Sequence, residues 1–176
     1  MVTSFPLSAV TGLLNELDSP HTDNIRKHEI EKQLCAFQQD SNSWPQCLHA
    51  LNNFYDNSDP KLANQFVWFF NVSTIEVAIR KKWKRLSELD RNQLRDNLWK
   101  TYSTLQMLDS VRFHREKLAQ LIALIGKRQY PDEHSLYLCH IMELLQRNFL
   151  LGITLLRATS EESIDTRDTL TTDQRK

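Results

Sequence analysis

The fold is decided by residues 59–87, which read DPKLANQFVWFFNVSTIEVAIRKKWKRLS. Large apolar residues recur in this stretch mostly three or four positions apart, which is the spacing of one face of an α-helix. They are Leu62, Phe66, Phe69, Phe70, Ile75, Ile79, Trp83 and Leu86. Asp59 can cap the helix, and Pro60 suits a first turn because no amide hydrogen is needed there. We therefore predict one long helix over about residues 60–86.

The same periodicity continues on both sides of this stretch. The expected helices cover about residues 4–18, 22–39, 43 onward, 60–86, 87 onward, 110–127, 131 onward and 148–163. Thr22 or Asp23 can cap the second helix, and Ser87 the fifth. Gly126 is expected to weaken the last turn of the sixth helix, and Pro131, followed by two acids, to start the seventh.

The helices pair into repeated units. The first helix of each pair begins near residue 4, 43, 88 or 131, and this spacing of about 40–45 residues is the period of a HEAT or armadillo array. A helical hairpin cannot bury its own apolar face, so neighbouring hairpins stack. We predict an all-α, HEAT/armadillo-like α-solenoid of about four antiparallel hairpins over residues 1–163; an ordinary eight-helix bundle is the alternative.

Residues 164–176 are expected to form a polar segment. Thr171 and Gln174 have the spacing of a capping box, which opens a helix. The segment is therefore expected to lead into a next helix, truncated before the rest of a superhelix, or to be a frayed polar tail. In the truncated case, the apolar face near Leu150, Ile153 and Leu156 would be exposed, and self-association would follow.

Composition excludes several classes of protein. The 22 basic and 22 acidic residues balance, whereas a dedicated nucleic-acid binder carries a basic excess. No run approaches the roughly 18 apolar residues of a membrane span, and no secretory signal is visible. The three cysteines form no CxxC pair, which argues against a disulfide framework and against a cysteine-based zinc site. A nuclear or cytosolic location is the simplest interpretation.

The sequence contains no recognisable catalytic or metal-binding motif. Phosphate-binding glycine loops, HExxH and GxSxG are all missing, so we predict neither an enzyme nor a cofactor. His134 and Cys139 fall on different helical faces, so we predict no metal site there. Cys35 and Cys139 lie on apolar stripes and are expected in the core. Residues 28–29 and 114–116 (His-Glu and His-Arg-Glu) are expected on charged, solvated helical faces.

A basic run of residues 80–85, RKKWKR, ends the long helix. Trp83 shares a face with Ile79 and Leu86, so we expect it in the core, while cations suit the negative end of a helix dipole. An aromatic residue among cations also occurs in nucleic-acid binders. The remaining surface is a basic ridge suited to an acidic protein, with simple solvation as the alternative.

Four segments resemble the importin-β/exportin family. Residues 25–34, IRKHEIEKQL, followed by Phe37, resemble the opening repeat of these receptors, and residues 83–86 are similar to the basic, tryptophan-ended second helix of their second repeat. Residues 115–131 resemble the third repeat of exportins. Residues 152–162, GITLLRATSEE, are similar to the exportins that carry actin–profilin.

This resemblance implies a non-enzymatic transport module that shuttles between nucleus and cytoplasm. The first repeats of such receptors bind Ran-GTP, mainly through the second helix of each hairpin, here residues 22–39, 60–86, 110–127 and 148–163. Cargo such as actin–profilin would bind cooperatively with Ran-GTP through a longer receptor. The polar candidates for Ran contact are Arg26, Lys27, Lys81, Lys82, Lys84, Arg85 and Lys117. The alternative function is a helical scaffold or adaptor without Ran affinity.

Overall fold

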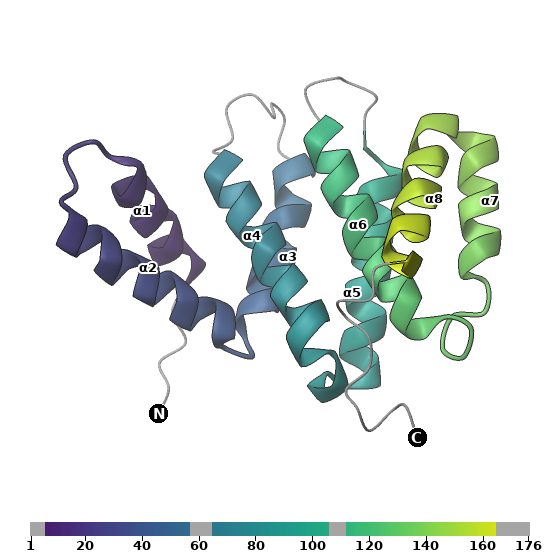
Figure 1. Ribbon diagram of the computed structural model, residues 1–176, viewed down its shortest axis with the longest axis horizontal. Coiled ribbons are helices and arrows are strands. Elements are labelled where there is room, and N and C mark those ends of the chain that lie inside the picture. Colours follow the sequence, from purple (N-terminus) through teal and green to yellow (C-terminus); the bar gives the residue numbers. More distant parts are fainter. Residues whose placement is uncertain (1–5, 57–64, 106–111, 165–176) are drawn as a thin grey trace. The chain divides into compact units, whose positions relative to one another are not determined.

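The protein is built from helices in the computed structural model, which describes residues 6–56, 65–105 and 112–164 (Figure 1). No strand occurs within these ranges, so the predicted all-α class is confirmed. The α-helices are α1 (Leu7–Asp18), α2 (Asn24–Gln39), α3 (Ser43–Asp56), α4 (Gln65–Val77), α5 (Glu88–Ser103), α6 (Arg112–Gln129), α7 (Tyr137–Arg147) and α8 (Phe149–Ile164). The chain divides into two compact units, Met1–Ala78 and Ile79–Lys176.

Each unit contains two helix pairs. In the first unit α1 packs on α2 and α3 on α4; in the second, α5 packs on α6 and α7 on α8. The second helices α6 and α8 also pack directly on each other, as consecutive second helices do in stacked hairpin repeats. The pairing predicted from the sequence is therefore present within each unit.

The core of the first unit follows most of the predicted apolar stripes, but Phe66 and Phe69 of α4, predicted on the inner stripe, are 59% and 50% exposed. The buried side chains of this unit include Val10, Leu13, Leu14, Ile30, Leu34, Phe37, Trp44, Cys47, Leu48, Leu51, Trp68, Phe70, Val72 and Ile75. The rings of Phe37 and Phe70 lie 6.0 Å apart and join α2 to α4. Ile25, expected on the inner stripe, is instead 78% exposed. Its position in the first turn of α2 places it before the stripe meets the core.

The long helix predicted to reach residue 86 changes its geometry near its end. Regular α-helix stops at Val77 and is followed by a π-helical segment, Ala78–Lys82, and a 3-10 turn, Trp83–Arg85. The predicted start at residue 60 lies outside the described residues. A tightened 3-10 turn is common where a helix ends. Here it buries Trp83 at 7% exposure, as predicted, before the backbone becomes extended at Leu86.

The fifth helix begins as expected. The Ser87 side chain accepts a hydrogen bond from the Asp90 amide, and the Asp90 carboxylate accepts one from the Ser87 amide, which completes a capping box. At the other end of α5, Tyr102 is fully buried and its hydroxyl donates to the Leu151 carbonyl oxygen at 2.7 Å. Burial raises the pKa of Tyr102, so its hydroxyl remains a donor and links α5 to α8.

The seventh helix starts later than Pro131, where the sequence analysis placed it. Residues 131–136 form turns, because the amides of Glu133 and His134 both donate to the Gln129 carbonyl oxygen and close the end of α6. Satisfying the last carbonyl groups of a helix in this way competes with opening a new helix. The helix α7 therefore begins at Tyr137.

Four side chains differ from the prediction: two expected in the core are exposed, and two expected on the surface are buried. Cys35 and Cys139 are exposed, not in the core, whereas Cys47 is buried and burial raises its pKa to about 12. His114 and Arg115, expected on a solvated face, are only 5% and 6% exposed. Burial lowers the pKa of His114 to about 4, so this ring stays neutral. Periodicity assigned these positions to a face without knowing where the neighbouring helix would pack.

Gly126 allows the close approach of the Tyr137 ring to α6. A Cβ atom at this position would overlap the ring of Tyr137. That ring cannot swing away freely, because it is buried and its hydroxyl lies 2.8 Å from Thr159 Oγ1. A small residue at position 126 is therefore required by packing.

We expect Gly126→Ala to destabilise the protein by about 1–3 kcal/mol, because the overlap outweighs the helix propensity that alanine adds. Gly12→Ala is the matched control, since a Cβ there meets nothing within 4 Å and alanine should stabilise by about 0.5–1 kcal/mol. Urea unfolding followed by circular dichroism measures both. A stabilising Gly126→Ala would contradict the close approach.

Candidate protein-binding surface

The seven predicted contact residues divide between the two units. Arg26 and Lys27 lie on α2 of the first unit, and the other five lie in the second unit. Four of these five lie in the π and 3-10 turns after α4, and Lys117 lies on α6. We call Lys81, Lys82, Lys84 and Arg85 the basic ridge.

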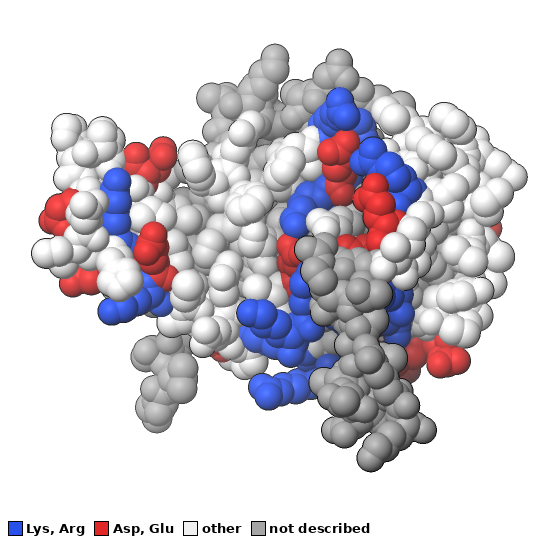
Figure 2. Space-filling view, in the orientation of Figure 1, with Lys and Arg blue, Asp and Glu red and all other residues white. Residues whose placement is uncertain are grey.

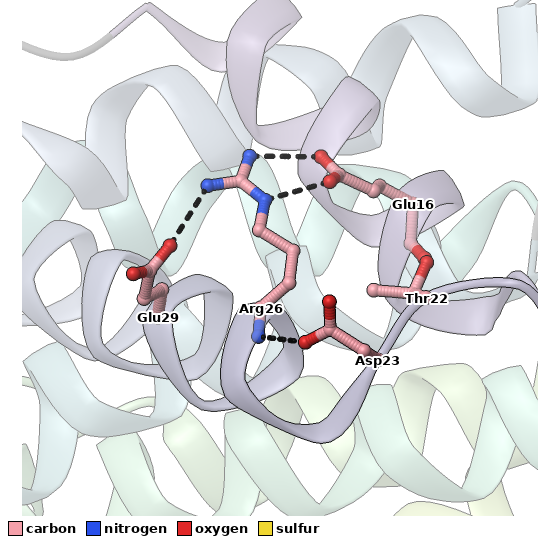
Figure 3. A network of polar contacts seen from close by, with 5 residues as sticks. All are labelled: Glu16, Thr22, Asp23, Arg26 and Glu29. Carbon is pink, nitrogen blue, oxygen red and sulfur yellow. Dashed lines mark hydrogen bonds and ion pairs between the residues drawn. The ribbon is translucent and has the colours of Figure 1, made fainter.

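Arg26 holds the corner between α1 and α2 (Figure 3). Its Nε and Nη2 donate to the two carboxylate oxygens of Glu16 at 2.7 and 3.0 Å, and its Nη1 donates to Glu29 at 3.3 Å. Paired arginine–carboxylate bonds of this kind are geometrically specific. The hydrogen bonds from Arg26 hold the pKa of Glu16 below its ordinary value.

The backbone at this corner is fixed as well. The Asp23 carboxylate caps α2 by accepting from the Arg26 amide at 2.8 Å, which selects Asp23 over Thr22 as the predicted cap. The Thr22 hydroxyl instead donates to the carbonyl oxygen of Glu16. The guanidinium of Arg26 is therefore committed to the hairpin, which weakens it as a candidate for partner contact.

The basic ridge presents its cations around a buried tryptophan. Lys81, Lys84 and Arg85 are exposed and Lys82 is half-buried, while Trp83 anchors the segment in the core. The cations sit at the end of the helix, where its dipole favours positive charge. The cations of the ridge therefore surround the buried Trp83 at the end of the helix.

A buried glutamate connects the start of the ridge to the second helices. Glu162 of α8 is 6% exposed, and its Oε1 lies 3.4 Å from Arg80 Nη2 and 3.3 Å from Gln120 Nε2. Lys127 of α6 donates to the Glu162 carbonyl oxygen at 2.7 Å. A buried carboxylate needs such partners. No sequence pattern predicts this network, because Arg80 and Glu162 are 82 residues apart.

Charges of both signs line the groove between α6 and α8 (Figure 2). A cavity of about 270 Å³ there is bordered by Lys117, whose Nζ donates to Gln120 Oε1 at 3.0 Å. Glu116 Oε1 lies 3.2 Å from Arg112 Nε and 3.5 Å from Arg157 Nη2. The hydrogen bond from Arg112 lowers the pKa of Glu116 most strongly. Of this set, the sequence singled out only Lys117.

Among the described residues, no three His, Cys, Asp or Glu side chains gather where they could hold a metal ion. His134 and His140 form a pair, with Nε2 and Nδ1 3.2 Å apart, and burial lowers the pKa of His134. None of the helices in the described ranges is both long and apolar enough to cross a bilayer.

Comparison with known proteins identifies the family. Residues 30–104 match the model of the importin-beta N-terminal domain. Exportin-6 of Danio rerio is 30% identical over 166 residues, and exportin-6 of Homo sapiens is 29% identical over 170 residues; each match covers 93% of this chain. Exportin-6 of Dictyostelium discoideum is 27% identical over 165 residues, covering 88% of the chain.

The chain spans only a small part of these relatives: 14% of the length of the fish and human proteins and 15% of the amoebal one. The similarity extends along nearly the whole chain and agrees with its helical pairs. The chain therefore belongs to the importin-β/exportin family of nuclear transport receptors, and its residues 30–104 correspond to the importin-β N-terminal domain.

Proposed function

We propose that the chain is a Ran-GTP-binding module of a nuclear export receptor and acts in nucleocytoplasmic protein transport. The observation that carries this proposal is that the second helices α6 and α8 pack directly on each other. Their shared face carries charged side chains that are engaged in hydrogen bonds and ion pairs. On this face Glu162 pairs with Arg80, which directly precedes the basic ridge. Such a face suits a protein partner with charges of both signs. Family membership supports the same function.

Side chains that are already engaged in hydrogen bonds favour binding, because they lose little conformational freedom when a partner docks. Gln120 and Lys127 are tied to Glu162, and Lys117 is bonded to Gln120. A surface organised before binding loses less conformational entropy when a partner arrives. The exposed cations of the ridge would mainly set the rate and orientation of encounter.

The strongest contact candidates are therefore Lys81, Lys84 and Arg85, which are exposed, together with the α6–α8 face. Lys82 and Lys117 stay candidates at its border. Arg26 is the weakest, because Glu16 and Glu29 engage its guanidinium. Lys27 is half-buried on α2, and it would contact the partner only if the first unit takes part in binding.

The wider role is also a proposal. The longer receptor would carry cargo such as actin–profilin, shuttle between nucleus and cytoplasm, and bind Ran-GTP and cargo with a shared coupling free energy, which is typically about 1–3 kcal/mol. Self-association of the chain is proposed through the predicted face near Leu150, Ile153 and Leu156, of which Ile153 is 40% exposed and the other two are half-buried. Exposed apolar residues on α7 and at the start of α8 would extend this surface: Leu138, Met142 and Phe149. Light scattering at increasing concentration would detect self-association.

The direct test is binding of the purified chain to Ran loaded with a non-hydrolysable GTP analogue, beside Ran loaded with GDP. We expect clear preference for the GTP form, because a receptor N-terminus must distinguish the two states. Equal affinity for both forms, or binding to neither, would reject the proposal and leave a helical scaffold without Ran affinity.

The basic ridge is tested by charge reversal. We expect Lys81→Glu combined with Lys84→Glu to slow association with the GTP form by about an order of magnitude, with the loss shrinking at high salt. The matched control is Lys100→Glu combined with Arg147→Glu, which makes the same charge change at exposed positions on the first helices α5 and α7. Equal losses in both variants would mean that only net charge matters.

The ion pairs of Arg26 with Glu16 and Glu29, here called the Arg26 clamp, should stabilise the folded chain in a pH-dependent way. Arg26→Ala should lower the urea midpoint at neutral pH, while Ran affinity changes little; Lys27→Ala is the control. Because the pKa of Glu16 is lowered in the folded state, the clamp contributes fully above the ordinary value of 4.5 and is lost as the pH falls through the lower folded value. A midpoint difference that persists in full at acidic pH would contradict this.

A further inference from the structure

A second cavity, of about 380 Å³, lies where α6 begins beside α8. Its polar wall consists of Arg112, Arg115 and Glu116 from α6 with Thr154 and Arg157 from α8. Three arginines face one glutamate, so the wall is cationic. We call this cavity the Arg115 pocket.

Arg115 is the unusual member of this wall. The residue is 6% exposed, and its buried Nε has no hydrogen-bond partner among the described residues. The nearby Tyr102 hydroxyl donates its proton to the Leu151 carbonyl oxygen, and its own oxygen makes no hydrogen bond with Arg115 Nε. A buried guanidinium normally has its donors satisfied. Arg115 therefore brings to the pocket a buried cation whose Nε is left without a partner among the described residues.

Glu116 does not supply that acceptor. Its Oε1 is shared by Arg112 at 3.2 Å and Arg157 at 3.5 Å, and Arg157 also lies 3.6 Å from Glu161. Both outer arginines are thus held by carboxylates at the entrance, whereas no ion pair is found for Arg115 within the described part of the chain. The pocket combines two ion-paired arginines with a third, buried arginine whose Nε has no partner among the described residues.

We propose that the Arg115 pocket binds a carboxylate side chain presented by the protein docked on the α6–α8 face. The proposal rests on the proposed function, in which the GTPase is that protein. Carboxylates match the planar donor fork of arginine. A single negative charge suits this wall better than a doubly charged phosphate, because Glu116 repels the ligand as well.

The pocket is tested first with small probes. In the ¹⁵N-labelled chain, the Nε–Hε signal of Arg115 should shift and saturate with a blocked tetrapeptide that contains two glutamates, and stay unchanged with its glutamine twin. Inorganic phosphate is the competing probe. Saturation by phosphate alone, or no shift with either anion, would overturn the carboxylate assignment.

The second test uses Arg115→Met, with Arg147→Met on α7 as the matched control. A buried cation without a partner is costly, so Arg115→Met should keep or raise the melting temperature, whereas loss of a structural contact would lower it. Circular dichroism measures this. The same variant should lose the peptide-induced change and weaken binding to Ran with the GTP analogue by at least about tenfold, while the control does neither.

The two proposals fail in different ways. If the glutamate peptide binds but Ran in the GTP form does not, the pocket stands and the proposed function is wrong. If Ran binds in the GTP form and Arg115→Met leaves that affinity unchanged, the proposed function stands. In that second case the assignment of the carboxylate to this partner is overturned.

Discussion

The packing of α6 against α8 is the contact on which the second unit depends. Two tyrosines from the first helices lock onto it: Tyr102 of α5 donates to a carbonyl oxygen of α8, and Tyr137 of α7 covers Gly126 of α6 and meets Thr159 of α8. Burial raises the pKa of both phenols, so both hydroxyls stay protonated. The hydroxyls of Tyr102 and Tyr137 thus join α5 and α7 to α8 through polar contacts.

The same packing produces the candidate binding surface. Bringing α8 onto α6 buries Glu162, and a buried carboxylate needs partners, which Arg80 and Gln120 supply, while Lys127 donates to the Glu162 carbonyl oxygen. The charges on this face are therefore a consequence of the fold. The π-helical segment that carries Arg80 begins where the chain divides into its two units, and π-turns inside helices often occur at functional positions.

Sequence reasoning recovered what depends on local spacing. The helix pairs, the Ser87 cap and the burial of Trp83 follow from periodicity and from residues a few positions apart. The misplaced residues, such as Ile25, Arg115 and Pro131, depend on which neighbour packs on a helix and on how carbonyl groups at a helix end are satisfied. For the candidate site, the sequence identifies the cations but not their partners, which lie far away in the chain. It therefore cannot distinguish an arginine that is engaged within its own hairpin, such as Arg26, from a cation that is available to a partner protein.

The central claim is that a partner docks on the second helices. It is tested most directly by hydrogen–deuterium exchange of the chain with and without Ran carrying a non-hydrolysable GTP analogue. The account predicts slower exchange in α6, in α8 and in the segment that carries the basic ridge, with little change in α5 and α7. Protection confined to α5 and α7, or spread evenly over all four helices, would contradict it.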